Sequence, residues 1–354
     1  MEPVSKFSVP NLLLLLAISS LSLVGVFVLN SIAPYVFPTH YIYLILALIL
    51  FFICTRIDFE IFIAFSPHLY LLSILLLVIT LVIGQVTRGA VRWIPLGFLT
   101  IQPSEVVRAF LLLYFARYLA ERDLNTKRLF TLFFLILIPF ILILIQPSLG
   151  VAILTGIGFV GILLSSIIEK KYFLMGLGFA AVVIPLVWFM LAPYQKQRVT
   201  GFINPEVDPL GSGYNSIQSM ISIGSGRFFG RGLGEGVQTQ LAFLPEKHTD
   251  FIFAATAEEL GFAGSFLVVI ALFVVFWVLI HIIGHAKNPT ARSYVTGIFL
   301  VLFAQTTIHI GMNMGLLPIT GVPLPFVSAG GSSLLATMTG LGIALGAYKK
   351  QANF

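Results

Sequence analysis

NLLLLLAISSLSLVGVFVL, residues 11–29, and LFTLFFLILIPFILILI, residues 129–145, decide the fold of this chain. Each is an almost unbroken apolar run, and a helix of roughly 20 apolar residues is long enough to cross the hydrocarbon core of a bilayer. The chain is 58% hydrophobic and 10% charged, with a mean hydropathy of +1.03, whereas soluble domains carry about 25% charged residues. The sequence therefore predicts an all-α polytopic membrane protein.

Proline, glycine and charged residues divide the hydrophobic sequence into about ten spans, which form a single membrane domain over 1–354. We expect a break or an amphipathic entry inside the long eighth span, at 258–261. The first span lacks a small-residue cleavage site, so we expect a retained helix and not a signal peptide. The predicted spans are 10–30, 40–55, 66–84, 104–121, 129–146, 150–168, 172–192, 251–283, 293–315 and 328–348.

Lysine and arginine are unevenly distributed between the two sides of this topology. With a cytoplasmic N-terminus, most of them fall in cytoplasmic segments, and the short loops of the opposite side contain only Arg88 and Arg92. The positive-inside rule then places both termini in the cytoplasm. The one large loop, about 193–250, becomes extracytoplasmic, and a connection of this length is usually functional or disordered. Because the loop is rich in aromatic residues, we expect it to pack against the helices or the membrane interface.

Cofactor signals are weak in this sequence. The only cysteine, Cys54, excludes an internal disulfide, and the six histidines are dispersed, so no zinc site is predicted. No cofactor is required by the sequence, although Mg²⁺ or Mn²⁺ bound loosely to carboxylates and phosphates would leave no motif. The net charge of +6 suits contact with anionic membrane lipids, and its scattered cations do not indicate nucleic-acid binding.

The stretch FLPEKHTDFIFAATAEELGF, residues 243–262, concentrates charge at the mouth of an apolar span. Thr249 or Asp250 could cap the first turn of that span. Asp250 could instead act as a general base at the outer boundary of the membrane, with Lys247 and His248 tuning it or binding an anion. Ionisable residues at membrane depth are more often functional than structural, and both interpretations of Asp250 remain open here.

Glu258 and Glu259 lie two turns further into the same span. Because they are adjacent, at least one should face the interior of the protein. An ion pair with an arginine would explain either glutamate structurally, and a supporting role at the site is the alternative.

RGAVRWIPLGFLTIQPSEVVRAF, residues 88–110, is the second charged stretch. Glu105 and Arg108 are three residues apart, so they share a helix face and can pair across it. Arg92 and Arg108 could alternatively bind a phosphorylated ligand, because the guanidinium fork fits phosphate oxygens. Trp93 is typical of a membrane-interface anchor.

Two further segments break the hydrophobic pattern. The glycine-rich stretch GSGRFFGRGLGEG, 224–236, lacks the strand–turn–helix context of a phosphate loop, so it predicts only a flexible or tightly turned segment. NMGLLPITGVPLPFVSAGGSSLLATMTGLG, 313–342, predicts broken backbone that shapes a cavity. Asn313, Ser328, Ser332 and Ser333 can bond the freed backbone groups there, and the glycines allow close helix contact.

Five motifs in order, IQPSEVVR, YQKQRV, GSGYNSIQSMISIGSG, LPEKHTDFIFAATAEELG and NMGLLPITGVPLPFVSAGGSSLL, resemble the SEDS family (shape, elongation, division and sporulation) over nearly the whole chain. The resemblance implies a peptidoglycan glycosyltransferase of the bacterial cytoplasmic membrane, which polymerises lipid II at the outer face. VQTQLAFLPEKHTDFIF and GLLPITGVPLPF are more similar to the RodA branch, which serves elongation and cell shape, than to the FtsW branch, which serves division.

The resemblance also implies roles for single residues. Asp250 matches the essential aspartate of the family, Arg92 its conserved arginine, and Gln102 and Glu105 lie in the matching QPSE motif. Two positions depart from the family pattern. Arg108 replaces a lysine and keeps the charge. Ser148 replaces an aspartate, which leaves the role of a second carboxylate at that position in doubt.

The chemistry that the resemblance implies needs one inversion, from an α-linked pyrophosphate to a β-1,4 bond. One base, Asp250, would take the proton from the acceptor hydroxyl. Positive charge from Arg92, Arg108 and Lys247 would stabilise the undecaprenyl pyrophosphate that leaves. The resemblance also implies a class B penicillin-binding protein as a partner, and the chain carries no transpeptidase motif of its own.

Two other functions share these features. A flippase for lipid-linked precursors would also have many spans, interrupted helices and intramembrane charges. It would need polar groups along a path through the membrane, whereas most unusual polar groups here concentrate at one face. A non-catalytic scaffold for cell-wall enzymes would not need the concentrated charge around Asp250.

Overall fold

The computed structural model describes residues 9–87, 90–97, 99–122, 125–166 and 213–349, with a few isolated positions between 178 and 202. In these ranges, 6 helices are long and apolar enough to cross a membrane, which confirms the prediction of an all-α polytopic membrane protein. The predicted seventh span, 172–192, lies almost entirely outside the described residues, so the count of about ten spans stays a prediction. The 6 helices are α1 (Val9–Ile32), α2 (Thr39–Arg56), α3 (Phe59–Ile83), α5 (Thr126–Ile145), α11 (Ile252–His285) and α12 (Pro289–Asn313).

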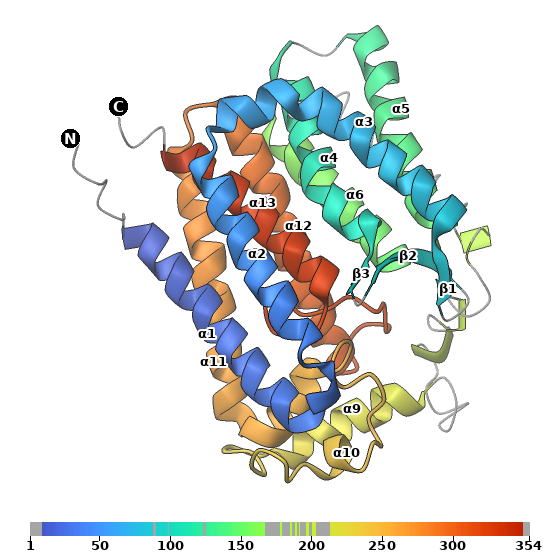
Figure 1. The fold of residues 1–354 in the computed structure, drawn as a ribbon, viewed down its shortest axis with the longest axis vertical. Coiled ribbons are helices and arrows are strands. Elements are labelled where there is room, and N and C mark those ends of the chain that lie inside the picture. Colours follow the sequence, from blue (N-terminus) through green and yellow to red (C-terminus); the bar gives the residue numbers. More distant parts are fainter. Residues whose placement is uncertain are drawn as a thin grey trace.

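Three more helices coincide with predicted spans: α4 (Pro103–Ala120), α6 (Leu149–Ser165) and α13 (Gly331–Lys349). Helix α13 is the centre of the bundle, since every residue from 332 to 347 is buried. Its glycines allow close approach; a Cβ added at Gly342 would lie 2.8 Å from the carbonyl oxygen of Phe51 on α2. Helix α1 begins and α13 ends at the same end of the bundle (Figure 1), as two termini on one side of the membrane require.

Short elements gather at the opposite end of the bundle. They are the 3-10 turn η1 (Pro34–Val36) and the helices α9 (Tyr214–Ser225) and α10 (Val237–Gln240), which lie below α1 and α11 in Figure 1. The described part of the predicted loop 193–250 is therefore folded. The glycine-rich stretch is tightly turned, with positive φ at Gly230, Gly232 and Gly234. Of the two forms expected for this segment, flexible or tightly turned, the structure has the tightly turned one.

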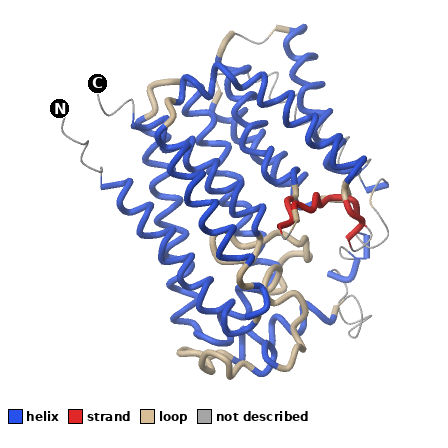
Figure 2. The backbone as a smooth tube through the Cα atoms, in the orientation of Figure 1, coloured by secondary structure: helices blue, strands red, loops and turns tan. Residues whose placement is uncertain are grey.

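The described residues of 85–101, a stretch expected as an outer loop, form a small antiparallel sheet at the ends of α3 and α4 (Figure 2). Its order is β1 (Gln85–Thr87), β2 (Ala90–Leu96), β3 (Leu99–Ile101). Trp93 pairs with Gln85 and Ile94 with Ile101. Strand β2 ends at Leu96 and β3 begins at Leu99, and Gly97 after β2 has a positive φ of 67°. The sheet places Arg92 beside the start of α4.

Of the two alternatives expected at 258–261, a break or an amphipathic entry, the structure has the break. Gly261 has φ 67° and ψ −164° inside α11, a left-handed conformation that a side chain rarely adopts. Residues 314–330, between α12 and α13, are not helical, as the prolines and glycines of that stretch predict. Both irregular segments lie at the same end of the bundle as α9 and α10 (Figure 1).

Candidate active site

Asp250 lies at the end of the bundle where the short elements gather, just before α11, and it is half-buried. Its backbone carbonyl accepts a hydrogen bond of 2.9 Å from Nδ2 of Asn313, the last residue of α12. Oδ1 of Asn313 accepts from the amide of Ala254, 3.0 Å away. The N-cap position of α11 belongs to Phe251, without a side-chain bond. The structure therefore assigns the N-cap position to Phe251 and not to Thr249 or Asp250, and the buried amide of Asn313 bonds an early amide of this helix.

The two residues before Asp250 are held by the segment that precedes α13. The amide of Ala329 donates to the carbonyl of His248 (3.0 Å), and the hydroxyl of Ser328 donates to the carbonyl of Thr249 (2.9 Å). With the bond from Asn313, three successive carbonyls, those of residues 248–250, bond to other parts of the chain. The backbone that carries Asp250 is thus fixed from two sides while its side chain keeps partial access to solvent.

Asn313 completes a polar stripe on α12 with Gln305 and His309, at intervals of four residues. All three side chains are fully buried. Nε2 of Gln305 donates to the carbonyl of Pro323 (2.9 Å), and Nδ1 of His309 lies 2.7 Å from the carbonyl of Val322. The stripe therefore binds the irregular segment 314–330 along the same helix face that fixes Asp250.

Lys247 and His248 contact different partners. Nζ of Lys247 donates to the carbonyl of Thr239, and burial lowers the pKa of this ammonium, against the attraction of Glu259 and Glu258. The His248 ring meets Tyr35 of η1 edge-on, with ring centroids 5.9 Å apart. Tyr35 is a residue that the sequence did not single out, since nothing marks a lone tyrosine between two apolar spans. A cation and an imidazole thus lie just before Asp250 along the chain.

Glu258 and Glu259 do not pair with arginine in the part of the chain that the structure describes. Glu258 accepts from the amides of Gln238 (2.8 Å) and Thr239 (2.9 Å). Glu259 accepts from the Ser31 hydroxyl (2.6 Å), besides donors at positions 234 and 240. Among the described residues no arginine forms this pair; backbone amides of the neighbouring loop and the Ser31 hydroxyl of α1 bind these fully buried carboxylates. Both glutamates support the loop and do not face an open site.

The QPSE segment meets α13 on another side of the same irregular segment. The amide of Gln102 donates to the hydroxyl of Ser332 (2.8 Å). Nε2 of Gln102 donates to Ser148 (3.1 Å) and to Ser104 (3.3 Å). Ser148, which stands where the family pattern has an acid, is therefore a buried acceptor for Gln102.

Glu105 is buried at the start of α4, between two arginines. Its carboxylate bonds to Ser333 and is attracted to Arg108 and Arg92, and Oε2 has no hydrogen-bond partner. Since Ser333 is one residue beyond Ser332, residues 328–333 touch both the 248–250 backbone and the QPSE segment. The structure thus connects the two charged stretches through one six-residue segment.

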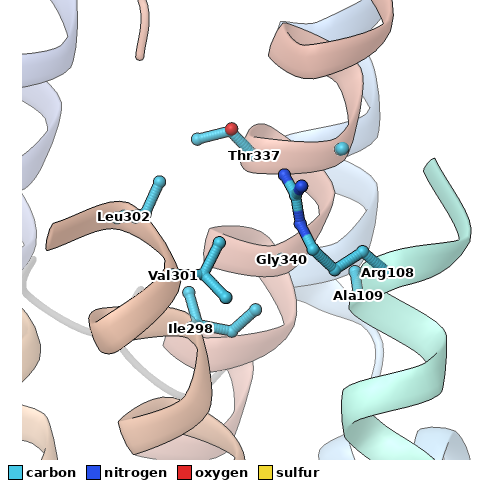
Figure 3. Close-up of a pocket in the computed structure, with 8 residues that line it drawn as sticks. Arg108, Ala109, Ile298, Val301, Leu302, Thr337 and Gly340 are labelled. Carbon is cyan, nitrogen blue, oxygen red and sulfur yellow. The ribbon is translucent and has the colours of Figure 1, made fainter. Parts of the chain in front are cut away.

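Arg108 is only 4% exposed, and its guanidinium extends from α4 toward α13, into a narrow pocket (Figure 3). The cavity volume is about 10 Å³, and Leu302 of α12 and Thr337 of α13 are among the lining residues. Leu302 and Asn313 are eleven residues apart on α12, about 16 Å along the axis. Arg108 is therefore enclosed within the bundle, far along the helix axis from the bonds that hold Asp250. Arg92, in contrast, is half-buried on β2 next to Trp93.

The chain matches the family described as cell cycle protein (FtsW/RodA/SpoVE) over residues 6–353. The chain belongs to this family, the SEDS family. The peptidoglycan glycosyltransferase MrdB of Escherichia coli K12 is 39% identical over 85% of this chain and 82% of its own length. The probable peptidoglycan glycosyltransferase FtsW of Coxiella burnetii is 37% identical over 94% of this chain and 92% of its own length.

Solved SEDS structures have the same fold. A chain from a complex described as "Structural coordination of polymerization and crosslinking by a peptidoglycan synthase complex" matches with a TM-score of 0.81 and 30% identity, over 96% of this chain and 98% of the other. The rod shape determining protein RodA of Thermus thermophilus matches with a TM-score of 0.72 and 27% identity, over 96% of each chain. The predicted family and fold are confirmed.

Proposed function

We propose that this SEDS protein is a peptidoglycan glycosyltransferase that polymerises lipid II into β-1,4-linked glycan at the outer face of the bacterial cytoplasmic membrane. The observation that carries the proposal is the 39% identity to an enzyme of that name over 85% of the chain. The geometry supports it, because the structure holds a half-buried carboxylate on a fixed backbone at one end of a helix bundle. Membrane lipids surround the bundle, and no nucleic acid takes part.

In this mechanism Asp250 is the general base. It accepts the proton of the acceptor's 4-hydroxyl as that oxygen forms a bond to the donor's anomeric carbon with inversion. The bond from that carbon to the pyrophosphate breaks, and its electron pair leaves with the undecaprenyl pyrophosphate. Because this leaving group is already a stable anion, no general acid is needed. A positioned general base contributes typically 10²–10⁴ in rate.

Lys247, His248 and Arg92 are the groups we propose for the pyrophosphate. Lys247 and His248 adjoin the base along the chain, and Arg92 is half-buried next to Glu105. Arg108 remains a proposed source of positive charge, but its enclosed guanidinium gives the least support for direct contact. Gln102, Glu105 and Ser332 would position Arg92 and the segment before α13.

Mg²⁺ or Mn²⁺ stays a proposal without a protein site to support it. No group of three or more His, Cys, Asp or Glu side chains among the described residues could hold a metal ion. A divalent ion would therefore take most of its ligands from substrate phosphates and water, as Mg²⁺ commonly does. No step above depends on it.

We propose a class B penicillin-binding protein as the partner and a RodA-like role in elongation. A related chain was solved in a peptidoglycan synthase complex that coordinates polymerization and crosslinking, which supports such a partner. A division role like that of FtsW is the alternative, given the 37% identity to an FtsW relative. The localisation of a tagged copy, along the side wall or at the septum, distinguishes the two roles.

Purified full-length protein incubated with lipid II tests the activity directly. Glycan chains resolved on a gel are expected, without nucleotide in the reaction. If translocation of lipid II across liposomes is found without any glycan, the protein is a flippase and the proposal is wrong. If neither occurs, with and without a class B partner and added Mg²⁺ or Mn²⁺, a scaffold role replaces it.

A further inference from the structure

The break in α11 leaves backbone groups without helical partners, and residues 226–232 satisfy them. In an uninterrupted helix the carbonyls of Glu258 and Glu259 would accept from amides four residues on. Here they accept from the amides of Arg231 (2.9 Å) and Gly232 (3.1 Å). The glycine-rich loop is thus inserted into the helix at the kink.

The helix also donates hydrogen bonds to the loop, from the other side of the kink. The amides of Phe262 and Ala263 donate to the carbonyls of Arg227 (2.9 Å) and Phe228 (3.0 Å). Irregular backbone near the membrane persists only where such groups find partners. Four backbone hydrogen bonds therefore give residues 227–232 a fixed position on α11.

This position places aromatic rings on the outside of the molecule. Phe228 stacks on Phe262 with centroids 5.7 Å apart, Phe262 stacks on Phe266 at 5.6 Å, and Phe229 meets Phe228 edge-on at 4.8 Å. All four side chains are at least half exposed, and Phe229 is 81% exposed. A row of rings this exposed is unusual for a surface in water.

The row continues the exposed apolar side of α11, on which Ile270, Phe273 and Trp277 also lie. From Phe262 to His281 the helix has a length of about 30 Å, the thickness of a hydrocarbon core. Trp277, which stacks on His281, lies near one end of this stretch, and tryptophan is enriched at membrane interfaces. A hydrocarbon layer of this thickness that ends near His281 would have its opposite boundary at the kink, beside Phe228 and Phe229.

Arg227 and Arg231 flank the two phenylalanines, and both side chains are exposed. Apolar rings at the hydrocarbon boundary match the acyl chains of a leaflet, and the arginines beside them match its headgroup phosphates. We propose that residues 227–231 are a membrane anchor, in which Phe228 and Phe229 insert among the acyl chains while Arg227 and Arg231 bind phospholipid headgroup phosphates. The anchor would hold the loop that leads to Asp250 at a fixed depth.

Spin labelling of the full-length protein in liposomes tests the insertion. The single native cysteine is removed by Cys54→Ser, and a nitroxide is attached at Phe229→Cys. Phe273→Cys, about 16 Å along α11 from Phe262, is the deep reference. Glu235→Cys, an exposed acid in the same loop as Phe229, is the aqueous reference. Collision with oxygen and with a water-soluble nickel chelate gives the depth. Gel filtration and melting temperature confirm that each variant is folded.

The expected label at 229 is accessible to oxygen and shielded from nickel, closer to the value at 273 than at 235. A label as accessible to nickel as at 235 overturns the anchor, and a label shielded from both reagents means that protein covers this surface instead. For the arginines, replacing phosphatidylcholine by phosphatidylglycerol should increase the measured depth, and Arg227→Gln with Arg231→Gln should abolish that increase. An increase that persists in the double variant excludes headgroup binding by these arginines.

Discussion

The side-chain amide of Asn313 donates to the backbone carbonyl of Asp250 across 63 residues of sequence, at 2.9 Å. Oδ1 of the same amide accepts from Ala254, 3.0 Å away. One fully buried side chain thus fixes the carbonyl before α11 and an amide in its first turn. The position of the carboxylate depends on this bond more directly than on any cap of α11.

Asn313→Asp separates the two functions of the amide. The variant keeps an acceptor for Ala254 but loses the donor to Asp250, and it places a second negative charge near the base. Losing a buried hydrogen-bond partner typically costs about 1–3 kcal/mol. We expect a fall in kcat for lipid II polymerisation of at least tenfold, with a melting temperature closer to that of the native protein than Asn313→Ala shows. A native rate in Asn313→Asp would contradict the positioning role.

Glu258→Gln tests how the loop before Asp250 is held. The carboxylate accepts from the amides of Gln238 and Thr239, and the new NH₂ group cannot accept a hydrogen bond. Thr239 in turn binds Lys247 through its carbonyl. Hydrogen exchange of residues 236–240 should become faster, while exchange in the centre of α12 stays unchanged. Unchanged exchange in the loop would mean that Glu258 does not hold it.

Gly261→Ala tests the kink. Gly261 has a φ of 67° and its Cα lies against the backbone of the inserted loop, so an added methyl group overlaps with that backbone. Gly224→Ala is the matched control, because this glycine is in α9 with nothing within 4 Å of an added Cβ. We expect Gly261→Ala to lower the melting temperature and Gly224→Ala to raise it slightly, since alanine is favoured in helices by about 0.5–1 kcal/mol. Equal effects would contradict the special role of Gly261.

The pH dependence of polymerisation should reveal Lys247. Burial lowers the pKa of its ammonium. This group therefore loses its charge at a lower pH than an ordinary lysine, whose pKa is about 10.4. If the charge binds the pyrophosphate, kcat/KM falls on the alkaline side through that lowered pKa. Lys247→Arg should move the fall to higher pH, because guanidinium stays charged. Lys247→Gln should show no such fall, and its kcat/KM should be lower than that of the native protein. The same alkaline fall in all three proteins would assign it to another group.

Composition and hydropathy were sufficient to predict most of the helices, because apolar runs the length of a bilayer have few alternatives. Gly261 could be predicted as a break from the Glu-Glu-Leu-Gly sequence inside an apolar span. The strands at 85–101 could not be predicted: β1 and β3 are three residues each, too short for an alternating pattern to stand out. Their pairing is decided by the neighbouring helix ends.

The residues of the candidate site could be named from motifs, but their contacts could not. Nothing local marks Asn313 as the partner of Asp250 or Ser332 as the partner of Gln102, because each bond joins distant segments. An ion pair with arginine was one explanation for Glu258 or Glu259, because a buried carboxylate usually needs a cation. Donors from the folded loop and from Ser31 of α1 bind Oε1 of Glu259 instead, and Oε2 has no hydrogen-bond partner among the described residues.

The most direct test of the account is the rate at which purified Asp250→Asn polymerises lipid II, compared with the native protein at equal melting temperature. Asparagine is similar in size to aspartate and keeps the backbone bond to Asn313, but it cannot accept the proton of the attacking hydroxyl. We predict a loss of roughly 10²–10⁴ in rate. Polymerisation by Asp250→Asn at the native rate would remove this carboxylate from the mechanism and contradict the account.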